Sequence, residues 1–352
     1  MVKSNLFIDI SWVEDKLSGG ARYSIENILK SIILNKKFSK FKIIFILNKK
    51  VLNKYTFLKK YNKIFLTNNK IINFIIRWFL LLYLYKPNVK QLYFCPNIYC
   101  PIIKLNFKVI NLFHDTQVIT FPKNFLYLRR VWIYFNILLC KNRSDTIIFT
   151  SKFIKREFTK KFLLKKKKVV INIPIFKNKL NYQSKLNIKA KSYMLCLSSR
   201  LPHKNLKTIE NLFREHGYLI KQKLIIAGLG THSKPRSTKY IKYLNYITEN
   251  EKNWLIKNSK FVLMPSLYEG FGMVAIESLV YGANVIASDL IVYRELVNNN
   301  INYISDPLKT KNWLSKILYL KKTKFNNYKD NTIINKFHHK YISDKYYSCF
   351  LN

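Results

Sequence analysis

Short apolar runs and helical repeats alternate along most of the chain. Runs typical of buried strands lie at residues 5–10, 41–47, 109–113, 145–150, 193–197, 223–227, 260–264 and 284–287. Between them, apolar residues recur every three or four positions, for example at Ile25, Ile28, Leu29, Ile32 and Ile33. The alternation indicates strand–helix units and predicts an α/β fold of doubly wound parallel sheets.

The length of the chain allows two domains. With 352 residues, 49% of them hydrophobic, each domain can bury a core of its own. A polar, lysine-rich segment at residues 173–191 interrupts the alternation and is the expected connection. We therefore predict an N-terminal domain at residues 1–180 and a C-terminal domain at residues 190–335.

The stretch at residues 264–289 combines a strand, a glycine-rich loop, a helix and a further strand. Glu269 lies on the loop and Glu277 inside the helix. A loop that leads into a helix N-terminus offers unpaired N–H groups to an anion, and carboxylates accept hydrogen bonds from sugar hydroxyls. A nucleotide sugar has this layout, with an anionic centre and a hydroxyl-rich part at each end. The alternative is two surface glutamates beside a glycine-rich turn.

The same stretch closely resembles the signature of retaining GT-B glycosyltransferases of family 4, also called glycosyltransferase group 1. The matching residues read P-S-L-Y-E-G-F-G-M-V-A-I-E-S-L-V-Y-G-A-N-V-I-A-S-D, with Asn284 where proline is usual. The resemblance implies that Glu269 is catalytic and binds the donor sugar ring, and that Glu277 binds the ribose. It also implies that phosphate or sugar oxygens are held by the backbone of the loop at Gly270, Phe271, Gly272 and Met273.

Three further segments resemble the same family. S-G-G-A-R-Y, with Gly19 and Gly20, is similar to its first donor-binding loop. F-H-D-T-Q-V-I-T-F-P places His114 where the family contacts the donor sugar and the reacting centre. P-H-K-N-L places Lys204 where the family binds the donor diphosphate, and Arg200 adds a second cation nearby.

The resemblance implies a GT-B architecture of two Rossmann-like domains that face each other across a cleft. The first is the acceptor side and the second binds the nucleotide sugar, while an aromatic-rich helix at residues 336–352 crosses back to the first domain. The chain contains no Asp-x-Asp motif. We therefore assign no metal ligand and no cofactor beyond the nucleotide sugar as co-substrate, and expect a metal-independent transfer. The resemblance also implies that the transfer retains anomeric configuration.

The charge balance points to an anionic partner. The chain has 63 Lys and Arg against 18 Asp and Glu, a formal net charge of +45, and no acidic residue lies between Glu26 and Asp115. Such a half-molecule is attracted to anionic lipid or nucleic acid. Few basic runs have the glycine–aromatic pattern of RNA-binding modules, so we favour the membrane over nucleic acid. The alternative is a lysine excess caused by A/T-rich codons.

The most apolar run, Ile71 to Tyr85, contains Arg77 and is too short to span a bilayer. It predicts either a buried helix or one that lies in the membrane interface, with Trp78 and the tyrosines at headgroup level. No signal peptide is evident, and five cysteines without ligand spacing suggest reduced thiols. These features predict a cytoplasmic protein, peripheral on the inner face of the membrane.

Three functions follow from these observations. The first is transfer of a sugar from a nucleotide-sugar donor to a hydroxyl of a lipid-linked or saccharide acceptor, in bacterial surface polysaccharide, lipopolysaccharide or glycolipid synthesis. The second is a catalytically silent GT-B-like partner at the membrane surface of a polysaccharide assembly. The paired Glu269 and Glu277 argue against this silent alternative, because an inactive copy need not keep both. The third is a nucleic-acid-binding protein held by charge alone.

Overall fold

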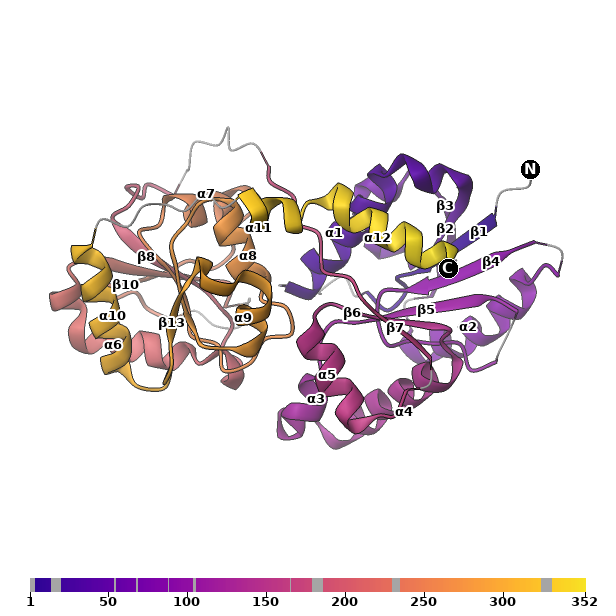
Figure 1. Ribbon diagram of the computed structural model, residues 1–352, viewed down its shortest axis with the longest axis horizontal. Coiled ribbons are helices and arrows are strands. Elements are labelled where there is room, and N and C mark those ends of the chain that lie inside the picture. Colours follow the sequence, from indigo (N-terminus) through magenta and orange to yellow (C-terminus); the bar gives the residue numbers. More distant parts are fainter. Residues whose placement is uncertain are drawn as a thin grey trace. The chain divides into compact units, whose positions relative to one another are not determined.

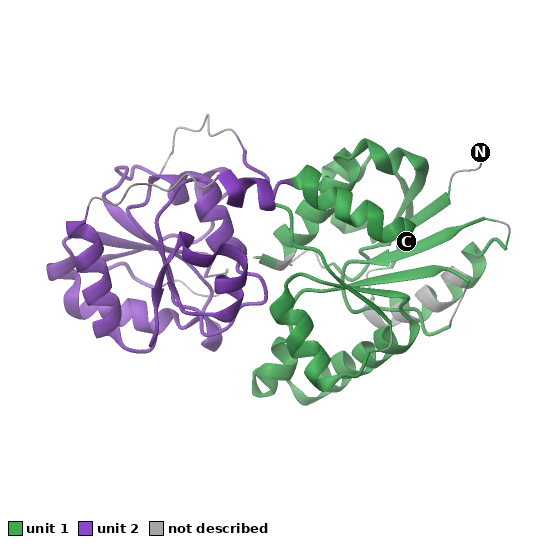
Figure 2. Ribbon diagram, viewed as in Figure 1, with its two compact units in different colours: residues 1–174, 339–352 green, residues 175–338 purple. Residues whose placement is uncertain are grey.

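The computed structural model consists of two compact units (Figure 2), residues 1–174 with 339–352 and residues 175–338. It describes residues 4–13, 20–53, 55–67, 69–87, 89–103, 106–164, 166–178, 186–229, 235–323 and 331–352. Each unit contains one parallel sheet of its own.

Unit 1 contains a seven-stranded sheet in the order β3-β2-β1-β4-β5-β6-β7 (Figure 1). All neighbouring strands are parallel, and Leu6 in β1 lies opposite both Ile43 in β2 and Leu92 in β4. The strand order reverses between β1 and β4. The strands are β1 (Ser4–Asp9), β2 (Phe41–Asn48), β3 (Asn62–Leu66), β4 (Gln91–Cys95), β5 (Lys108–Phe113), β6 (Thr146–Phe149) and β7 (Lys167–Val170).

Helices cover both faces of the unit 1 sheet. Figure 1 shows α1 (Gly20–Leu34) and α12 (His339–Leu351) on one side, with α2 (Lys70–Leu84), α4 (Tyr127–Arg143) and α5 (Lys152–Lys161) on the other. The change of side follows from right-handed crossovers, because the chain reverses its direction across the sheet after β3. A short α3 (Gln117–Thr120) precedes α4.

The last helix, α12, completes the core of unit 1. Its Phe350 ring lies 5.1 Å from Phe94 in β4 and 5.7 Å from Phe38. Lys108 at the start of β5 donates hydrogen bonds to the backbone carbonyls of Cys349 and Phe350, each at 3.1 Å. The final segment of the chain is therefore an integral part of the first unit.

Unit 2 contains a six-stranded parallel sheet in the order β10-β9-β8-β11-β12-β13. Its strands are β8 (Tyr193–Leu197), β9 (Lys223–Ala227), β10 (Ile241–Tyr243), β11 (Val262–Met264), β12 (Val285–Ser288) and β13 (Asn302–Ile304). Its helices are α6 (Leu206–Ile220), α7 (Glu249–Asn258), α8 (Met273–Val280), α9 (Ile291–Val297), α10 (Thr310–Lys322) and α11 (Asn331–Lys336).

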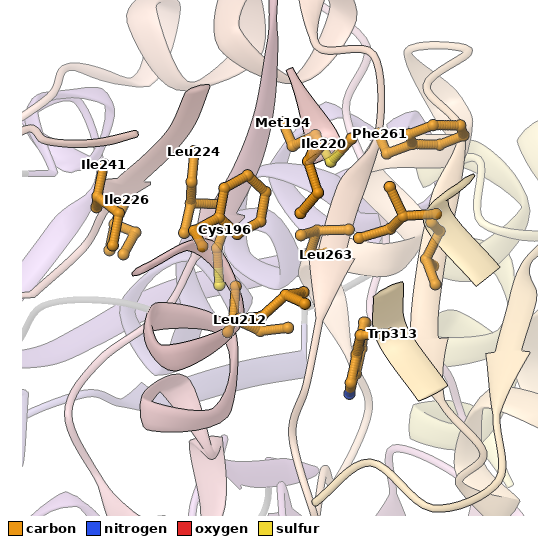
Figure 3. Close-up of a cluster of buried hydrophobic side chains, with 14 of the residues drawn as sticks. Met194, Cys196, Leu212, Ile220, Leu224, Ile226, Ile241, Phe261, Leu263 and Trp313 are labelled. Atoms are coloured by element: carbon orange, nitrogen blue, oxygen red, sulfur yellow. The ribbon is translucent and has the colours of Figure 1, made fainter. Parts of the chain in front are cut away.

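One core cluster of unit 2 joins the sheet to α6 and α10. Met194 and Leu263, from β8 and β11, are fully buried together with Leu212 of α6 and Trp313 of α10 (Figure 3). The strands are nearly continuous apolar runs because both faces of a parallel sheet are covered. This packing fixes the ends of the strands, from which the candidate site extends.

Both sheets have the doubly wound order in which the first and fourth strands are neighbours, and the predicted α/β fold class is confirmed. In such sheets, ligands bind at the carboxyl ends of the strands, where the strand order reverses. This point lies between β1 and β4 in unit 1 and between β8 and β11 in unit 2. Within the described residues, no helix has both the length and the apolar character needed to cross a bilayer.

Candidate active site

Two loops meet at the point of unit 2 where the strand order reverses. The loop after β8 carries Arg200 and Lys204, and the loop after β11 carries Glu269. The loops are joined by a hydrogen bond of 2.7 Å from the N–H of Leu267 to the carbonyl of His203. Lys204 and Glu269, 65 positions apart in the chain, are thus brought to one edge of the sheet.

Lys204 and Glu269 form an ion pair at this edge. Lys204 Nζ lies 2.7 Å from Glu269 Oε1, and Ser266 Oγ donates to the same oxygen at 2.8 Å. The two charged side chains are 25% and 12% exposed, so both are partly open to solvent. An ammonium suited to phosphate therefore lies beside a carboxylate suited to hydroxyl groups.

The N-terminus of α8 follows directly. Gly272 has φ +75°, and a Cβ at this position would lie 2.3 Å from Cε1 of Tyr293. The left-handed backbone and the packed tyrosine ring each require glycine here. The backbone N–H groups of Phe271, Gly272 and Met273 donate no hydrogen bond to any described residue. Together with the positive end of the helix dipole, these amides are able to bind an anion.

Glu277, one turn further along α8, is buried against α7. Both of its carboxylate oxygens lie 3.0 Å from Lys252 Nζ, and Glu249 Oε1 lies 2.9 Å from the same ammonium. Each oxygen of a carboxylate accepts about two hydrogen bonds, so Glu277 keeps acceptor capacity beyond Lys252. The side chain of Glu277 is 9% exposed.

Two groups of this cluster, Lys252 and Glu277, have shifted pKa values. Burial by itself would lower the pKa of Lys252, but Glu277 and Glu249 raise it above its ordinary value. Burial raises the pKa of Glu277, and Lys252 opposes that effect while Glu249 adds to it. Both directions follow from one lysine shared between two acids, which keeps the lysine charged and leaves one acid partly uncompensated.

The structure pairs Arg200 with a different residue. Its Nη2 donates to Oε1 of Glu210 on α6 at 3.0 Å, and the same oxygen accepts a hydrogen bond of 2.9 Å from Tyr243. Glu210 is almost fully buried, so the guanidinium neutralises a buried carboxylate. Arg200 therefore lies on the loop after β8 and is paired there with Glu210 of α6.

His114 follows β5 in unit 1. Its Nε2 lies 2.9 Å from the carbonyl of Pro96, which can only accept, so Nε2 carries the proton. Burial lowers the pKa of His114, and the Pro96 carbonyl and Asp115 only partly oppose this effect. In the neutral ring, Nδ1 then accepts from Ser24 Oγ at 3.2 Å. The imidazole is thus held in one tautomer between the end of β4 and α1.

The two glycines of the first loop differ in what the structure says of them. Gly19 lies outside the described residues. Gly20 is the first residue of α1, and a Cβ added there would meet no atom within 4 Å. Packing within the chain therefore does not require glycine at position 20, in contrast to position 272.

Sequence reasoning missed several partners of the predicted residues. Lys252 is 25 positions from Glu277, and no local pattern connects them. Its only sequence signal is the spacing of three positions from Glu249, typical of a pair on one helix face. Ser24 and Tyr293 act through tertiary contacts and leave no pattern in the sequence. Ser266 lies three positions before Glu269, inside the matching motif.

Comparisons with known proteins identify sequences and structures that are similar to this chain. The model of the family described as glycosyl transferases group 1 matches residues 178–337. The chain is 24% identical over 234 residues to the O-antigen chain mannosyltransferase RfbU of Salmonella typhimurium, which covers 61% of this chain and 63% of that protein. It is 25% identical over 146 residues to an uncharacterized glycosyltransferase of Methanocaldococcus jannaschii, covering 37% of this chain and 35% of that one. The matches thus span less than two thirds of these relatives.

Solved structures share the fold over nearly the full chain. The structure of Anabaena HepE in complex with UDP and glucose has a TM-score of 0.70 at 15% identity, covering 99% of both chains. A Staphylococcus aureus TarM variant in complex with UDP and saccharide ligands has a TM-score of 0.72 at 13% identity, covering 99% of this chain and all of that one.

These findings confirm the resemblance drawn from the sequence. The chain has the GT-B fold, with two Rossmann-like domains. Its second unit carries the glycosyl transferases group 1 domain.

Proposed function

We propose that the protein is a retaining glycosyltransferase that moves a sugar from a nucleotide-sugar donor to an acceptor hydroxyl. The observation that carries the proposal is the Lys204–Glu269 pair, which joins the loop after β8 to the loop that leads into α8, where the amides of Phe271, Gly272 and Met273 donate to no described residue. A cation, hydrogen-bond donors and a carboxylate in this order match the diphosphate and sugar of such a donor.

Charge develops on the diphosphate as the glycosidic bond breaks, and preorganised donors lower the energy of that state. We assign this task to Lys204 and to the backbone amides of Phe271, Gly272 and Met273. We also assign Gly270, which precedes these amides, to the donor-binding loop. Arg200 is paired with Glu210, but its side chain is 43% exposed, and we assign its remaining N–H groups to the diphosphate as hydrogen-bond donors.

Two carboxylates bind the hydroxyl-rich ends of the donor. Glu269, which Ser266 and Lys204 hold through one oxygen, accepts from the sugar hydroxyls with the other. Glu277 accepts from the ribose hydroxyls with the lone pairs that Lys252 leaves open.

From unit 1 we assign His114 a contact with the donor sugar and Gly20 and Gly19 a place in the first donor-binding loop. Because both ring nitrogens of His114 are hydrogen-bonded within unit 1, we assign the sugar contact to the face or edge of its ring and no proton transfer to its nitrogens. We propose a same-face displacement in which the leaving phosphate takes the proton of the acceptor hydroxyl. No metal ion and no cofactor besides the co-substrate take part in this scheme.

The acceptor is a lipid-linked or saccharide hydroxyl in bacterial surface-polysaccharide, lipopolysaccharide or glycolipid synthesis, at the inner face of the cytoplasmic membrane. This part of the proposal draws support from the similarity to an O-antigen chain mannosyltransferase. The strongly basic character of the chain is consistent with work at an anionic surface.

The test combines donor binding with turnover. We expect one member of a panel of UDP- and GDP-sugars to raise the melting temperature of the purified protein. Glu269→Gln should lower the rate of transfer, or of slow donor hydrolysis, by about 10²- to 10³-fold because it removes a charge from the reacting centre. Glu215→Gln on the exposed surface of α6 is the matched control and should leave the rate unchanged.

Two outcomes would contradict the proposal. A Glu269→Gln variant with the rate of the unaltered protein would remove the assigned site. Donor binding without any transfer or hydrolysis, under conditions in which a related transferase turns over, would support the catalytically silent alternative.

A further inference from the structure

The solvent face of α4 is apolar. Five side chains at helical spacing, between 38% and 80% exposed, form what we call the α4 stripe: Leu128, Val131, Trp132, Phe135 and Leu138. The opposite face, which includes Asn136, Ile137 and Cys140, is buried. A surface helix normally buries its apolar side chains and exposes polar ones. The α4 stripe reverses that rule over nearly three turns, which marks an interaction surface.

A second helix on the same side of the sheet repeats this pattern. The exposed side chains of α2 include Ile72, Ile75, Phe79, Leu82 and Tyr83. Figure 1 shows α2 and α4 together on the side opposite α1 and α12. Of the two predictions made for residues 71–85, full burial is therefore wrong, because these side chains face solvent. The outward apolar face agrees with the interfacial alternative.

Basic residues surround the α4 stripe. Lys123, Arg129, Arg130, Lys141 and Arg143 lie on or beside the helix, and residues 116–144 contain no Asp or Glu. The guanidinium of Arg129 lies 5.6 Å from the ring centroid of Phe125, and that of Arg130 lies 5.8 Å from the ring centroid of Tyr127. The arginines are thus held at the N-terminal end of the stripe by aromatic rings.

The location of the stripe connects it with the candidate site. α4 follows β5 and His114, so its N-terminus lies near the carboxyl edge of the unit 1 sheet. The exposed Leu126 and Tyr127 extend the apolar surface toward that edge. A hydroxyl presented from a surface bound here would be close to the edge that bears His114.

We propose that the α4 stripe docks the protein on an anionic lipid bilayer. The leucine, valine and phenylalanine side chains enter the boundary between headgroups and acyl chains, Trp132 lies at headgroup level, and the arginines contact lipid phosphates. The α4 stripe is thus the surface on which the membrane of the proposed function would bind. Docking itself does not depend on the transferase assignment; only the identity of the acceptor rests on the proposed function.

The same charges decide against other occupants. A second copy of the chain docked on this stripe would bring two sets of arginines together, and like charges across an interface oppose association. Nucleic acid offers phosphates for the arginines but no apolar phase for Leu128, Val131 and Leu138. Anionic lipid supplies both the apolar and the charged complement.

Flotation with lipid vesicles tests the proposal on the full chain. We expect the protein to float with vesicles of phosphatidylcholine and phosphatidylglycerol and to bind more weakly to phosphatidylcholine alone. The double substitution Trp132→Gln and Phe135→Gln should weaken binding by about tenfold, because it removes two aromatic side chains from the interface. Arg129→Gln should weaken binding by about fivefold, and only to the anionic vesicles.

A matched control is available on unit 2. Tyr218 and Leu219 on α6 are 58% and 42% exposed, so Tyr218→Gln with Leu219→Gln removes a comparable apolar surface elsewhere. Its flotation should equal that of the unaltered protein. Thermal unfolding of each variant verifies that the exposed substitutions leave the fold intact.

Three results would overturn the docking surface. They are flotation of the stripe variant at the level of the control, absence of flotation with anionic vesicles, and a dimer of the unaltered protein that the stripe substitutions convert to monomer. Donor-induced thermal stabilisation, measured on the same variants without vesicles, separates this proposal from the proposed function. A protein that binds donor but does not float with vesicles contradicts the docking surface and leaves the transferase assignment standing. A protein that floats but does not bind donor contradicts the transferase assignment and leaves the docking surface standing.

Discussion

The two sheets share one strand order, but they place different chemistry where that order reverses. In unit 2, the Lys204–Glu269 pair remains partly open to solvent, beside amides that donate no hydrogen bond to any described residue. In unit 1, Asp9 at the end of β1 is fully buried and accepts from Ser11 and from the hydroxyl of Tyr93. The comparison teaches that topology selects the position of a site, while the hydrogen bonds of each carboxylate decide whether it can meet a ligand.

The largest effect that sharpens this contrast is expected at Lys252. Lys252→Met leaves the buried Glu277 and the partly exposed Glu249 without their cation and should cost about 3–5 kcal/mol of the free energy of unfolding. Urea or thermal unfolding measures this loss. Lys252→Arg, which keeps the charge, should recover part of the stability, and a stable Met variant would show that the cluster contributes little.

The same variant has a pH signature. The pKa of Glu277 is raised in the folded protein, so the protonated side chain stabilises the fold at low pH. This contribution to the free energy of unfolding is lost as pH rises through the folded pKa. Donor binding has the opposite sign, because ribose hydroxyls require the carboxylate. The Michaelis constant for the donor should therefore fall as pH rises through this pKa, and Lys252→Met should move the transition to higher pH. An unchanged profile would separate Glu277 from the ribose.

Gly272 and Gly20 provide the second comparison. Gly272→Ala should cost about 2–3 kcal/mol and abolish donor binding, because the backbone is left-handed and the new Cβ meets Tyr293. Gly20→Ala should change the free energy of unfolding by less than about 0.5 kcal/mol, because it meets no atom.

The two glycine variants are measured by thermal unfolding and by the donor Michaelis constant. A weaker donor affinity of Gly20→Ala at unchanged stability would indicate that the ligand itself requires the small residue. Tyr293→Ala combined with Gly272→Ala should restore part of the lost stability if the ring causes the clash. Equal stability of the two single variants would contradict the assigned role of Tyr293.

The smallest effect is expected at Ser24. Ser24→Ala removes the hydrogen bond to Nδ1 of His114, worth about 1 kcal/mol, and should lower the transfer rate about fivefold with little change in stability. Because the pKa of His114 is lowered, the neutral ring persists to a pH below the ordinary range of histidine. Activity that depends on the neutral ring should fall only below that range, and Ser24→Thr should retain it.

The sequence predicted the parts of the fold that show a clear period. The runs at residues 109–113 and 193–197 coincide with β5 and β8, because buried parallel strands are continuous apolar segments. The short or lysine-containing strands β3, β7 and β10 were missed because they have little apolar signal. In β4, Gln91 and Cys95 weaken the signal in the same way.

The sequence predicted which loops carry the candidate site residues, but it did not predict which side chains pair with each other. The sequence placed Lys204 and Glu269 on loops at strand ends, and the structure joins them at 2.7 Å. It also placed Arg200 beside the diphosphate; the structure shows that guanidinium paired with Glu210, and the contact with the diphosphate stays a prediction. Ion pairs between distant helices and strands depend on tertiary packing, so no spacing in the chain foretells them.

The two ends of unit 2 lie next to each other. Ile175 and His338 form an isolated parallel bridge, and the N–H of Ile175 donates to the carbonyl of Phe337 at 2.9 Å. Residues 175–338 consequently form a segment whose first and last residues are adjacent in space. Exchange of residues 175–338 between related chains would preserve both flanking segments. Under the proposed function, such an exchange would transfer donor preference without acceptor preference.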